Sequence, residues 1–532
     1  MSLHHFLAPF TISETTLFTL ADRFSHIYKN LAASSVEQFF PTPVTRLPTG
    51  REKGRYLAVY VGLFYLRVAF IELLGEPTGH TPLQRQRVRR TLEKAWSIEE
   101  RLKRDRAREL FKWIGDCIAE VVKDRLDGEG EGDGDGEDEV VMGISFCFPM
   151  KQTSLDEAIL MPTGKGFALS SDLNLRQALL DGYECHTIRH DEEPTAKRQK
   201  RHALPKLKIA AMTNDTVATL ASLAYSIKSL PNSRVVMGLI VGAGCNATVP
   251  MKLTDLHASK TSHIRANDPS ATHTLVCTEW TLHGAAKPLR DLNLVTPWDT
   301  QLESHTDRPG FQPLEYMTGG RYIGELVRIV TVDYLTRELG IARSSLPVAL
   351  TNKHNALTTD FLSLVVSPST CDDSLCRTLA AKFPPPESSV WQWTASAAGA
   401  LRVIASTVQT RSAALVAAAT VGLLACTGEI RLHNDLDSGN NSASSAVSWQ
   451  RGPEELVVAV SGGVVQHYPK FKETVQWQID RLMMRAGPQD GGRSVFLREA
   501  SDGGIIGVGV LAGTVAGKIE GIIGSTLAPT ST

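Results

Sequence analysis

The sequence has few cysteines and no export signal. Its eight cysteines are scattered over 532 residues without a CxxC pair, and no histidine near Cys371 and Cys376 completes a metal-ligand set. The first ten residues lack the basic flank and the long apolar core of a secretory signal. The sequence therefore predicts an intracellular protein with reduced thiols rather than a disulfide framework.

The chain also lacks a surplus of charge and a long apolar run. Its 56 Lys and Arg residues nearly balance its 57 Asp and Glu residues, so charge gives no reason to expect direct binding to nucleic acid or to acidic membranes. The longest apolar run, Ser412 to Cys426, is too short to cross a bilayer core of about 30 Å. We expect a buried helix there, no membrane insertion and a cytoplasmic protein.

Two polar segments interrupt the chain. Residues 127–139 read DGEGEGDGDGEDE, which offers nothing apolar to bury and predicts a disordered acidic loop. Asp133 and Asp135 alternate as in a calcium loop, but the Gly and Glu that such a loop needs are missing at the required offsets. Residues 186–202 form a basic loop in which Lys197 to Arg201 could act as a nuclear-import signal, so a nuclear location stays open.

Between these segments strands and helices mix. Tyr56–Gly62 and Leu66–Leu73 are close enough to form a β-hairpin, and Thr81–Leu126 has apolar residues at helical spacing, which predicts a long charged helix. The Gly- and Ala-rich end, Ile505–Ile523, predicts a helix packed closely on another element. Apolar or β-branched runs predict further strands at Val140–Phe148, Lys208–Met212, Val235–Val241, Leu275–Trp280 and Leu456–Val465.

Nine short motifs follow one another in a characteristic order. They read FPTPVTRLPTGREKG, SFCFPMKQTSLDEAIL, GKGF, NDTV, GLIVGAGCNA, TEW, LEYMTGGRYIGELVR, TRSAAL and QHYPKFKE. Each motif alone is weak evidence, but in this order and at these separations the chain resembles eukaryotic, especially fungal, hexokinases from about Phe10 to about Gly517.

The resemblance implies an α/β fold of two domains, the actin-like ATPase (ribonuclease H-like) hexokinase fold with a central cleft. Hexose and MgATP meet in that cleft, and closure around the sugar excludes water. By resemblance, residues 1–54 would join the large domain and residues 214–500 would form the rest of it. Residues 55–213 would form the small domain, to which residues 501–532 would return as a C-terminal helix.

The sugar side of the family site is partly kept. Asp215, in Asn214-Asp215-Thr216, matches the family's catalytic base, and it follows a predicted strand that would present its carboxylate to the cleft. The resemblance assigns hexose binding to residues that keep the family type, namely Lys165, Asn214, Asp215, Glu279 and Glu315.

Four other positions in the sugar motifs depart from the family. Cys147 replaces a Ser, Gly164 a Thr, Cys277 an Asn and Thr281 a Gly. A thiol is a weak hydrogen-bond donor, and each lost hydrogen bond should cost roughly 0.5–1.5 kcal/mol. We expect Cys147 and Cys277 to line a site that binds hexose weakly.

The first phosphate motif is altered most. Where the family has Asp-x-Gly-Gly-Thr-Asn-x-Arg, this chain has residues 60–67, YVGLFYLR, in which Gly62 and Arg67 alone are kept. Tyr60 stands where the family has a carboxylate that acts through the magnesium shell. Residues 63–65, Leu-Phe-Tyr, cannot reach positive φ cheaply, so we expect the turn to take another shape and its bulk to fill the space meant for phosphates.

Other phosphate motifs are better kept. Residues 242–246, GAGCN, resemble the family's Gly-Thr-Gly-Ser/Thr-Asn loop, whose backbone amides cradle an anion. Ser461-Gly462-Gly463 replaces an Asp-Gly-Ser near the adenosine site, and Asp502-Gly503-Gly504 keeps part of the closing motif. The resemblance assigns nucleotide binding to Gly62, Arg67, Thr216, Gly242, Ala243, Gly244, Gly462 and Gly503, and the sequence assigns no residue as a direct metal ligand.

Two functions follow from these observations. Loss of the metal-directed carboxylate and of charge-assisted donors should slow phosphoryl transfer by a factor of the order of a thousand or more. The sequence therefore favours a catalytically impaired hexokinase-like protein that binds hexose and regulates carbon metabolism through protein partners. The alternative is an active hexose kinase that uses Mg and ATP to phosphorylate the 6-hydroxyl of glucose or a related sugar.

Overall fold

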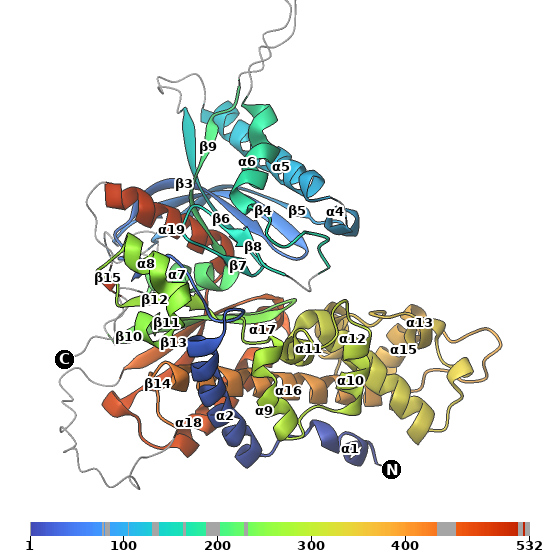
Figure 1. Ribbon diagram of the computed structural model, residues 1–532. Coiled ribbons are helices and arrows are strands. Elements are labelled where there is room, and N and C mark those ends of the chain that lie inside the picture. The colour runs from blue at the N-terminus through green and yellow to red at the C-terminus, as the bar shows by residue number, and fades with distance from the viewer. Residues whose placement is uncertain are drawn as a thin grey trace, which may run out of the picture. The chain divides into compact units, whose positions relative to one another are not determined.

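The structure is a computed structural model that describes residues 2–76, 79, 86–104, 106–129, 138–162, 166–187, 203–227, 232–432, 454–519 and 525–526. The chain packs as two compact units (Figure 1). Unit 1 contains Met1–Gln38, Leu239–Ala247 and Glu279–Glu499, and unit 2 contains Phe39–Gly238, Thr248–Thr278 and Ala500–Thr532. The domain boundaries drawn from the family resemblance stay a prediction.

Unit 2 is built on a five-stranded sheet with the order β5-β4-β3-β6-β9. Strand β3 pairs antiparallel with β4 and parallel with β6, and β6 pairs parallel with β9. The predicted hairpin is confirmed, because Tyr60 lies opposite Arg67 and Val61 opposite Leu66 in the β3–β4 register. The strand bounds are Lys53–Val61 (β3), Tyr65–Leu74 (β4), Val88–Ser97 (β5), Glu139–Phe146 (β6) and Lys206–Asn214 (β9).

Helices cover both faces of this sheet (Figure 1). The guanidinium of Arg125, on α5, lies 4.7 Å from the ring of Phe70, whereas a Cβ at Gly509, on α19, would lie 3.0 Å from the side chain of Ile71. Because successive strand residues point to opposite faces, α5 and α19 lie on opposite sides. The helix bounds in this unit are Glu100–Arg104 (α4), Ala107–Glu129 (α5), Leu175–Tyr183 (α6), Asp215–Ser226 (α7), Ala258–Asn267 (α8) and Gly503–Ile519 (α19).

Glycine in α19 allows the close packing that the sequence predicted for the C-terminal segment. A Cβ at Gly507 would lie 1.7 Å from the carbonyl oxygen of Ala218 on α7, so the two helices meet backbone to backbone. A Cβ at Gly143 on β6 would likewise lie 2.3 Å from the carbonyl oxygen of Val508. The prediction of a closely packed helix is therefore confirmed over Gly503–Ile519, and residues 520–523 of the predicted segment lie outside the described residues.

The predicted helix over Thr81–Leu126 is wrong in its first half. Val88–Ser97 is strand β5, which pairs with β4 along its whole length, and α5 begins at Ala107. Tertiary pairing overrides the helical spacing here, since β4 offers an open edge to this segment. The strand's charged side chains suit an exposed sheet edge.

Short strands complete unit 2. Strand β12 pairs antiparallel with both β1 and the Thr248–Lys252 part of β11, β2 pairs with β15, and β7 pairs with β8. Their bounds are Phe40–Pro41 (β1), Arg46–Leu47 (β2), Met150–Lys151 (β7), Ile159–Leu160 (β8), Cys245–Lys252 (β11), His273–Cys277 (β12) and Ser525–Thr526 (β15). Strand β10, Ser233–Val241, has residues in both units.

Unit 1 is organised around α16, a 32-residue helix over Ala395–Cys426. It packs against α2 and α18, and 89% of its most apolar window is buried. The helix is long and apolar enough to cross a membrane by length and composition alone, which corrects the short span expected from Ser412–Cys426. Its burial is typical of a core helix.

The other long helices of unit 1 are Glu14–Ser34 (α2), Pro297–Ser304 (α10), Gly320–Asp333 (α12), Asp372–Lys382 (α15) and Phe471–Ala486 (α18). The short ones are Leu3–Phe6 (α1), Lys287–Asp291 (α9), Pro313–Thr318 (α11), Val348–Asn352 (α13), Thr359–Phe361 (α14) and Gly463–His467 (α17). Strands β13 (Glu455–Ser461) and β14 (Ser494–Glu499) pair in parallel. The strand predicted over Leu456–Val465 is therefore too long, because Gly462 at φ 116° ends it and α17 follows.

Because Lys260 is buried, we expect the stability of the protein to depend on pH. This lysine of α8 is buried, its ammonium donates to the carbonyl oxygen of Phe39 at 3.1 Å, and burial lowers its pKa from 10.5 to about 8. Between these values the unfolded chain binds more protons, so this residue makes stability rise with pH from about 8 to 10.5.

Urea unfolding at pH 7 and pH 10 checks this expectation. In the wild type, Lys260 should raise the free energy of unfolding by roughly 2–3 kcal/mol between pH 7 and pH 10, and Lys260→Met should lose this rise. At pH 7 the variant should therefore be more stable than the wild type. Lys252→Met, at an exposed position of β11, is the matched control and should keep the wild-type slope. An unchanged slope in Lys260→Met would contradict a low pKa at this site.

Candidate functional site

Asp215 lies where β9 ends and α7 begins. Asn214 is the N-cap of α7, and its side-chain oxygen accepts from the Thr216 backbone N–H at 3.0 Å and from the Thr216 hydroxyl at 2.6 Å. Asn favours this cap because its short amide satisfies a backbone donor that the first helical turn leaves unpaired. The buried Asp215 carboxylate thus stands on a fixed helix start directly after a strand, as the sequence predicted.

The segment of Cys147 lies beside this helix start. The Asn214 amide donates to the carbonyl oxygen of Phe148 at 3.1 Å, and the Cys147 backbone N–H donates to the carbonyl oxygen of Val61 at 3.0 Å. The Cys147 thiol is buried. Unit 2 therefore brings together the end of β3, the Cys147 segment and the carboxylate of Asp215.

Thr216 is held by a chain of buried polar groups. Its hydroxyl lies 2.6 Å from the hydroxyl of Thr248 and 3.8 Å from the sulfur of Cys277. The sequence did not single out Thr248, because a threonine inside a β-strand carries no local signal. These contacts give Thr216 a structural role at the base of α7, whatever it does for a ligand.

Unit 1 holds the two glutamates assigned to hexose binding. The Asn246 amide donates to Glu279 Oε1 at 2.7 Å, and the Gln38 amide donates to the Glu279 carbonyl oxygen at 2.8 Å. Glu279 is buried and has φ 47°, a strained backbone for a non-glycine residue that is often found at functional sites. Asn246 and Gln38 were missed as positioning residues, although Asn246 lies in the GLIVGAGCNA motif.

The second phosphate loop, residues 242–246, is a tight turn that is hydrogen-bonded to the start of α12. The Gly242 N–H donates to the Gly244 carbonyl at 2.9 Å, and Gly320 N–H donates to the Gly242 carbonyl at 2.7 Å. The Cys245 N–H donates to Glu315 Oε2 at 3.2 Å, and a Cβ at Gly244 would lie 2.7 Å from the same oxygen. The loop therefore requires glycine, and it links Glu315 to the phosphate motif.

Further contacts join this loop to the adenosine motif. The Arg321 N–H donates to the Ala243 carbonyl at 3.0 Å. A Cβ at Gly242 would lie 3.4 Å from the Cα of Gly462, so these two backbones are in close approach. Unit 1 thus gathers Gly242, Ala243, Gly244, Gly462 and Glu315, whose roles toward a ligand stay predictions.

The altered hairpin has a turn without left-handed residues. The Gly62 N–H donates to the Tyr65 carbonyl at 2.9 Å, and none of residues 62–65 has positive φ. The expectation that Leu-Phe-Tyr avoids positive φ is confirmed, whereas a difference from the family's turn stays a prediction. Leu63 is 7% exposed, whereas Phe64 and Tyr65 are 49% and 56% exposed, so only the first of the three bulky side chains packs inward.

Tyr60 lies under this turn. A Cβ at Gly62 would lie 3.0 Å from the Tyr60 ring, and a Cβ at Gly504 would lie 2.8 Å from it, so the ring is packed between two glycines. Burial, and after it the charges of Asp215 and Cys147, raise the pKa of Tyr60 well above its ordinary value. The phenol is neutral at physiological pH. Magnesium prefers carboxylate and phosphate oxygens, and residues 60–65 offer no carboxylate, so this turn does not fit the ion.

Arg67 is engaged by carboxylates of its own unit. Its Nε donates to Glu93 Oε1 at 2.8 Å, and its Nη1 donates to Asp502 Oδ1 at 2.6 Å. Arg90 joins the network, 2.8 Å from Asp502 and 2.9 Å from Glu93. The charges of these two arginines and two carboxylates cancel. Arg67, which is kept from the family motif, is therefore bound to the segment that contains Gly503.

Some predicted features lie outside the described residues. These are Lys165 and Gly164 of the sugar motif, residues 130–137 of the acidic loop and residues 188–202 of the basic loop. Asp127–Glu129 of the acidic segment belong to α5, and Glu139 begins β6.

Sequence comparison now decides the family. Two profiles, both described as hexokinase, match residues 2–225 and 236–514. The chain belongs to the hexokinase family. It is 27% identical to a hexokinase of Emericella nidulans over 64% of this chain and 61% of that protein, and 24% identical to hexokinase-1 of Saccharomyces cerevisiae over 98% of this chain and 95% of that one. The chain spans about three fifths of the length of the hexokinases of Emericella nidulans and Schwanniomyces occidentalis.

A solved structure supports the hexokinase fold. The hexokinase from Schistosoma mansoni complexed with glucose superposes with a TM-score of 0.72 at 24% identity, covering 96% of this chain and 98% of that one. The predicted family and α/β hexokinase fold are confirmed. The departures from the family motifs therefore occur on a hexokinase fold. The assignment of residues 60–67 to the family's first phosphate hairpin stays a prediction.

Proposed function

We propose that this chain is a catalytically impaired hexokinase that binds hexose and acts as a regulator of carbon metabolism. One observation carries the proposal: a neutral, packed phenol at Tyr60 stands where the family resemblance places a metal-directed carboxylate. The Tyr60 ring is packed closely against Gly62 and Gly504, which leaves it little room to move aside for a metal.

Hexose binding is supported by carboxylates that are buried and already oriented. Asp215 follows a capped helix start, Glu279 accepts from Asn246, and Glu315 accepts from a loop amide. Pre-oriented acceptors favour a ligand rich in hydroxyl groups because little ordering remains to be done on binding. Since each hydrogen bond lost at Cys147 or Cys277 should cost roughly 0.5–1.5 kcal/mol, we propose weak rather than tight binding.

Slow phosphoryl transfer is supported by the size of the transition-state stabilisation that the absent carboxylate and hydrogen-bond donors would supply. The reaction depends on positioning and on stabilisation of charge by metal and donors. A bound metal supplies several kcal/mol at the transition state, and each charge-assisted donor adds roughly 1.5–3 kcal/mol. Asp215 cannot replace these contributions, because a base does not hold the phosphate.

The regulatory part of the proposal concerns protein partners of this hexokinase. A chain that binds sugar without consuming it can report the sugar concentration through a change of conformation. The sequence of Lys197 to Arg201 supports action in the nucleus as well as in the cytoplasm.

A turnover assay tests the proposal. Purified protein mixed with MgATP and glucose should release ADP at least about a thousandfold more slowly than an active hexokinase under the same conditions. Isothermal calorimetry with glucose alone should still detect weak binding. ADP is measured by an enzyme-coupled assay.

Asp215→Asn separates background from catalysis in this assay. It keeps the length of the side chain and removes the base, so in the impaired protein it should leave the residual ADP signal unchanged. Fast turnover that Asp215→Asn abolishes would establish the alternative, an active ATP-dependent hexose kinase, which the retention of Asp215 favours.

A further inference from the structure

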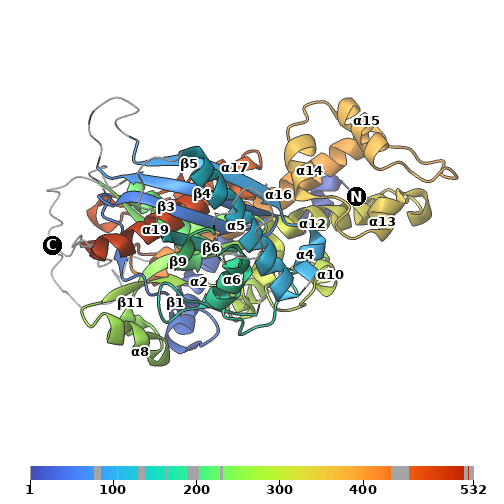
Figure 2. The ribbon, with the colours of Figure 1, turned by 90° about the horizontal axis from the view of Figure 1, so that it is seen from above.

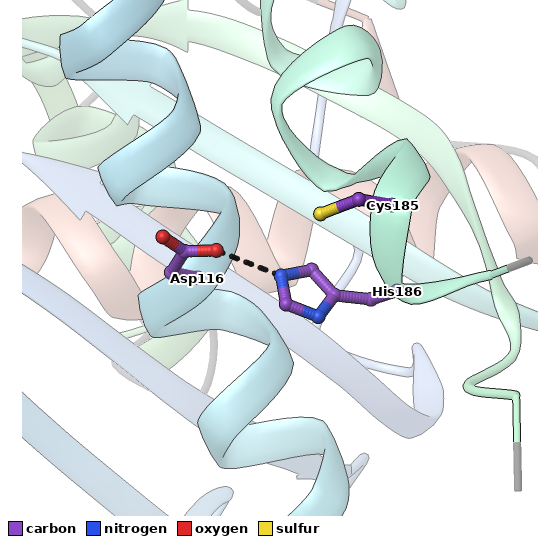
Figure 3. A group of neighbouring side chains, drawn as sticks. All are labelled: Asp116, Cys185 and His186. Atoms are coloured by element: carbon purple, nitrogen blue, oxygen red, sulfur yellow. Dashed lines mark hydrogen bonds and ion pairs between the residues drawn. The ribbon is translucent and has the colours of Figure 1, made fainter. Parts of the chain in front are cut away.

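Three side chains with different donor atoms meet away from the sugar and phosphate motifs. Asp116 lies on α5, and Cys185 and His186 lie on η2, the helical turn Glu184–His186 after α6. One ligand atom from each side chain lies within 4.8 Å of the other two. His186 Nε2 and Asp116 Oδ1 are 2.8 Å apart, and the Cys185 sulfur lies beside the same imidazole (Figure 3).

Glycine contacts fix the two elements that carry this cluster. A Cβ at Gly115 would lie 2.2 Å from the carbonyl oxygen of Gly182, and a Cβ at Gly182 would lie 2.2 Å from the carbonyl oxygen of Phe111. Helices α5 and α6 therefore touch backbone to backbone, and they lie side by side in Figure 2. Asp116 directly follows one of these glycines, so its carboxylate is held close to the turn that ends α6.

The turn itself is anchored on both sides of His186. The Leu204 N–H donates to the His186 carbonyl at 2.9 Å, and the Thr187 N–H donates to the Glu184 carbonyl at 3.0 Å. The ring of His186 lies 5.7 Å from the ring of Tyr183, whose hydroxyl donates to the Pro205 carbonyl at 3.1 Å. These contacts orient the imidazole without using the donor atoms that face Asp116 and Cys185.

We propose that Asp116, Cys185 and His186 form a binding site for Zn²⁺. Thiolate sulfur, imidazole nitrogen and carboxylate oxygen are the ligands that zinc takes in proteins, and three protein ligands leave one tetrahedral position for water. To bind the ion through Nε2, the neutral His186 imidazole would carry its proton on Nδ1, and the Cys185 thiol would release its proton to solvent. The atom separation of up to 4.8 Å needs only a small inward movement of exposed side chains.

The chemistry selects against the magnesium used by the family. Mg²⁺ is bound by oxygen ligands, whereas this cluster offers one carboxylate among a sulfur and a nitrogen. Asp116 and Cys185 are exposed, so an ion can enter from solvent. None of the three residues belongs to a sugar or phosphate motif. The proposed zinc site can therefore be tested independently of the proposed loss of kinase activity.

Cobalt spectroscopy of the full chain tests the site. Co²⁺ bound by a thiolate gives a charge-transfer band in the near ultraviolet. One equivalent of zinc per chain should displace the cobalt and remove this band. Cys185→Ser should abolish the band, and His186→Asn and Asp116→Asn should each lower zinc affinity at least about tenfold, measured by competition with a chromophoric chelator. Mg²⁺ in excess should leave the band unchanged.

Cys371→Ser is the matched control, because Cys371 is also an exposed cysteine and lies on the other unit. It should keep the wild-type band and affinity. A band that persists in Cys185→Ser, or wild-type zinc affinity in all three cluster variants, would overturn the proposal and leave an ordinary surface hydrogen bond between Asp116 and His186. Circular dichroism that matches wild type shows that each variant is folded.

Discussion

Restoring the family sequence in the first phosphate hairpin is expected to raise ATP affinity at least about tenfold. The variant combines Tyr60→Asp, Leu63→Gly, Phe64→Thr and Tyr65→Asn. Tyr60→Asp restores a carboxylate for the magnesium shell, and Leu63→Gly removes a bulky side chain. Phe64→Thr and Tyr65→Asn restore two hydrogen-bond donors, and each charge-assisted contact should contribute roughly 1.5–3 kcal/mol. Calorimetry with MgATP in the presence of glucose measures the affinity, and the coupled assay should show ADP release well above wild type.

Two controls locate this effect. The exposed positions alone, Phe64→Thr with Tyr65→Asn, change the surface of the turn but not its metal chemistry, so they should recover little affinity. The restored hairpin combined with Asp215→Asn should bind ATP and release no additional ADP. If the full restoration changes neither affinity nor turnover, the hairpin is not the main defect and the altered sugar motif becomes the better explanation.

Arg411→Ala is expected to destabilise unit 1 by about 3–5 kcal/mol. The Arg411 guanidinium donates two hydrogen bonds of 2.7 Å to Asp299, and the side chains are 1% and 7% exposed. Asp299 also caps α10 through Thr296, and Arg411 lies 4.5 Å from the ring of Phe10. Removing the arginine leaves a buried carboxylate without its cation, which is the costly way to break such a pair.

Arg402→Ala on the same helix is the matched control. Arg402 bonds Asp372 at 2.7 Å, but both side chains are more than a third exposed, so the loss should be no more than about 1 kcal/mol. Urea unfolding followed by tryptophan fluorescence measures both variants. Equal destabilisation of the two would contradict a special role for the buried pair.

The sequence predicted the parts of this protein that depend on local pattern and on ordered motifs. The β3–β4 hairpin follows from two apolar segments that lie close together in the chain, and the position of Asp215 follows from a predicted strand directly before it. The absence of positive φ in the turn at residues 62–65 follows from Leu-Phe-Tyr. In each case the residues that carry the signal are neighbours in the chain.

The parts that the sequence did not predict depend on distant partners. Val88–Ser97 has helical spacing and becomes a strand because β4 offers it an edge. Thr248 and Gln38 acquire their roles from Thr216 and Glu279, which are far away in the sequence. The cluster of Asp116 with Cys185 and His186 forms because two glycines let α5 and α6 touch, and no motif marks it.

The central claim is that the hairpin around Tyr60 provides no place for a metal-bound triphosphate. Crystals grown with glucose, Mg²⁺ and a non-hydrolysable ATP analogue test it most directly. We predict density for hexose beside Asp215 and no ordered metal or γ-phosphate beside residues 60–65. An ordered Mg²⁺ and γ-phosphate at that hairpin, with Tyr60 displaced from Gly62 and Gly504, would contradict the account.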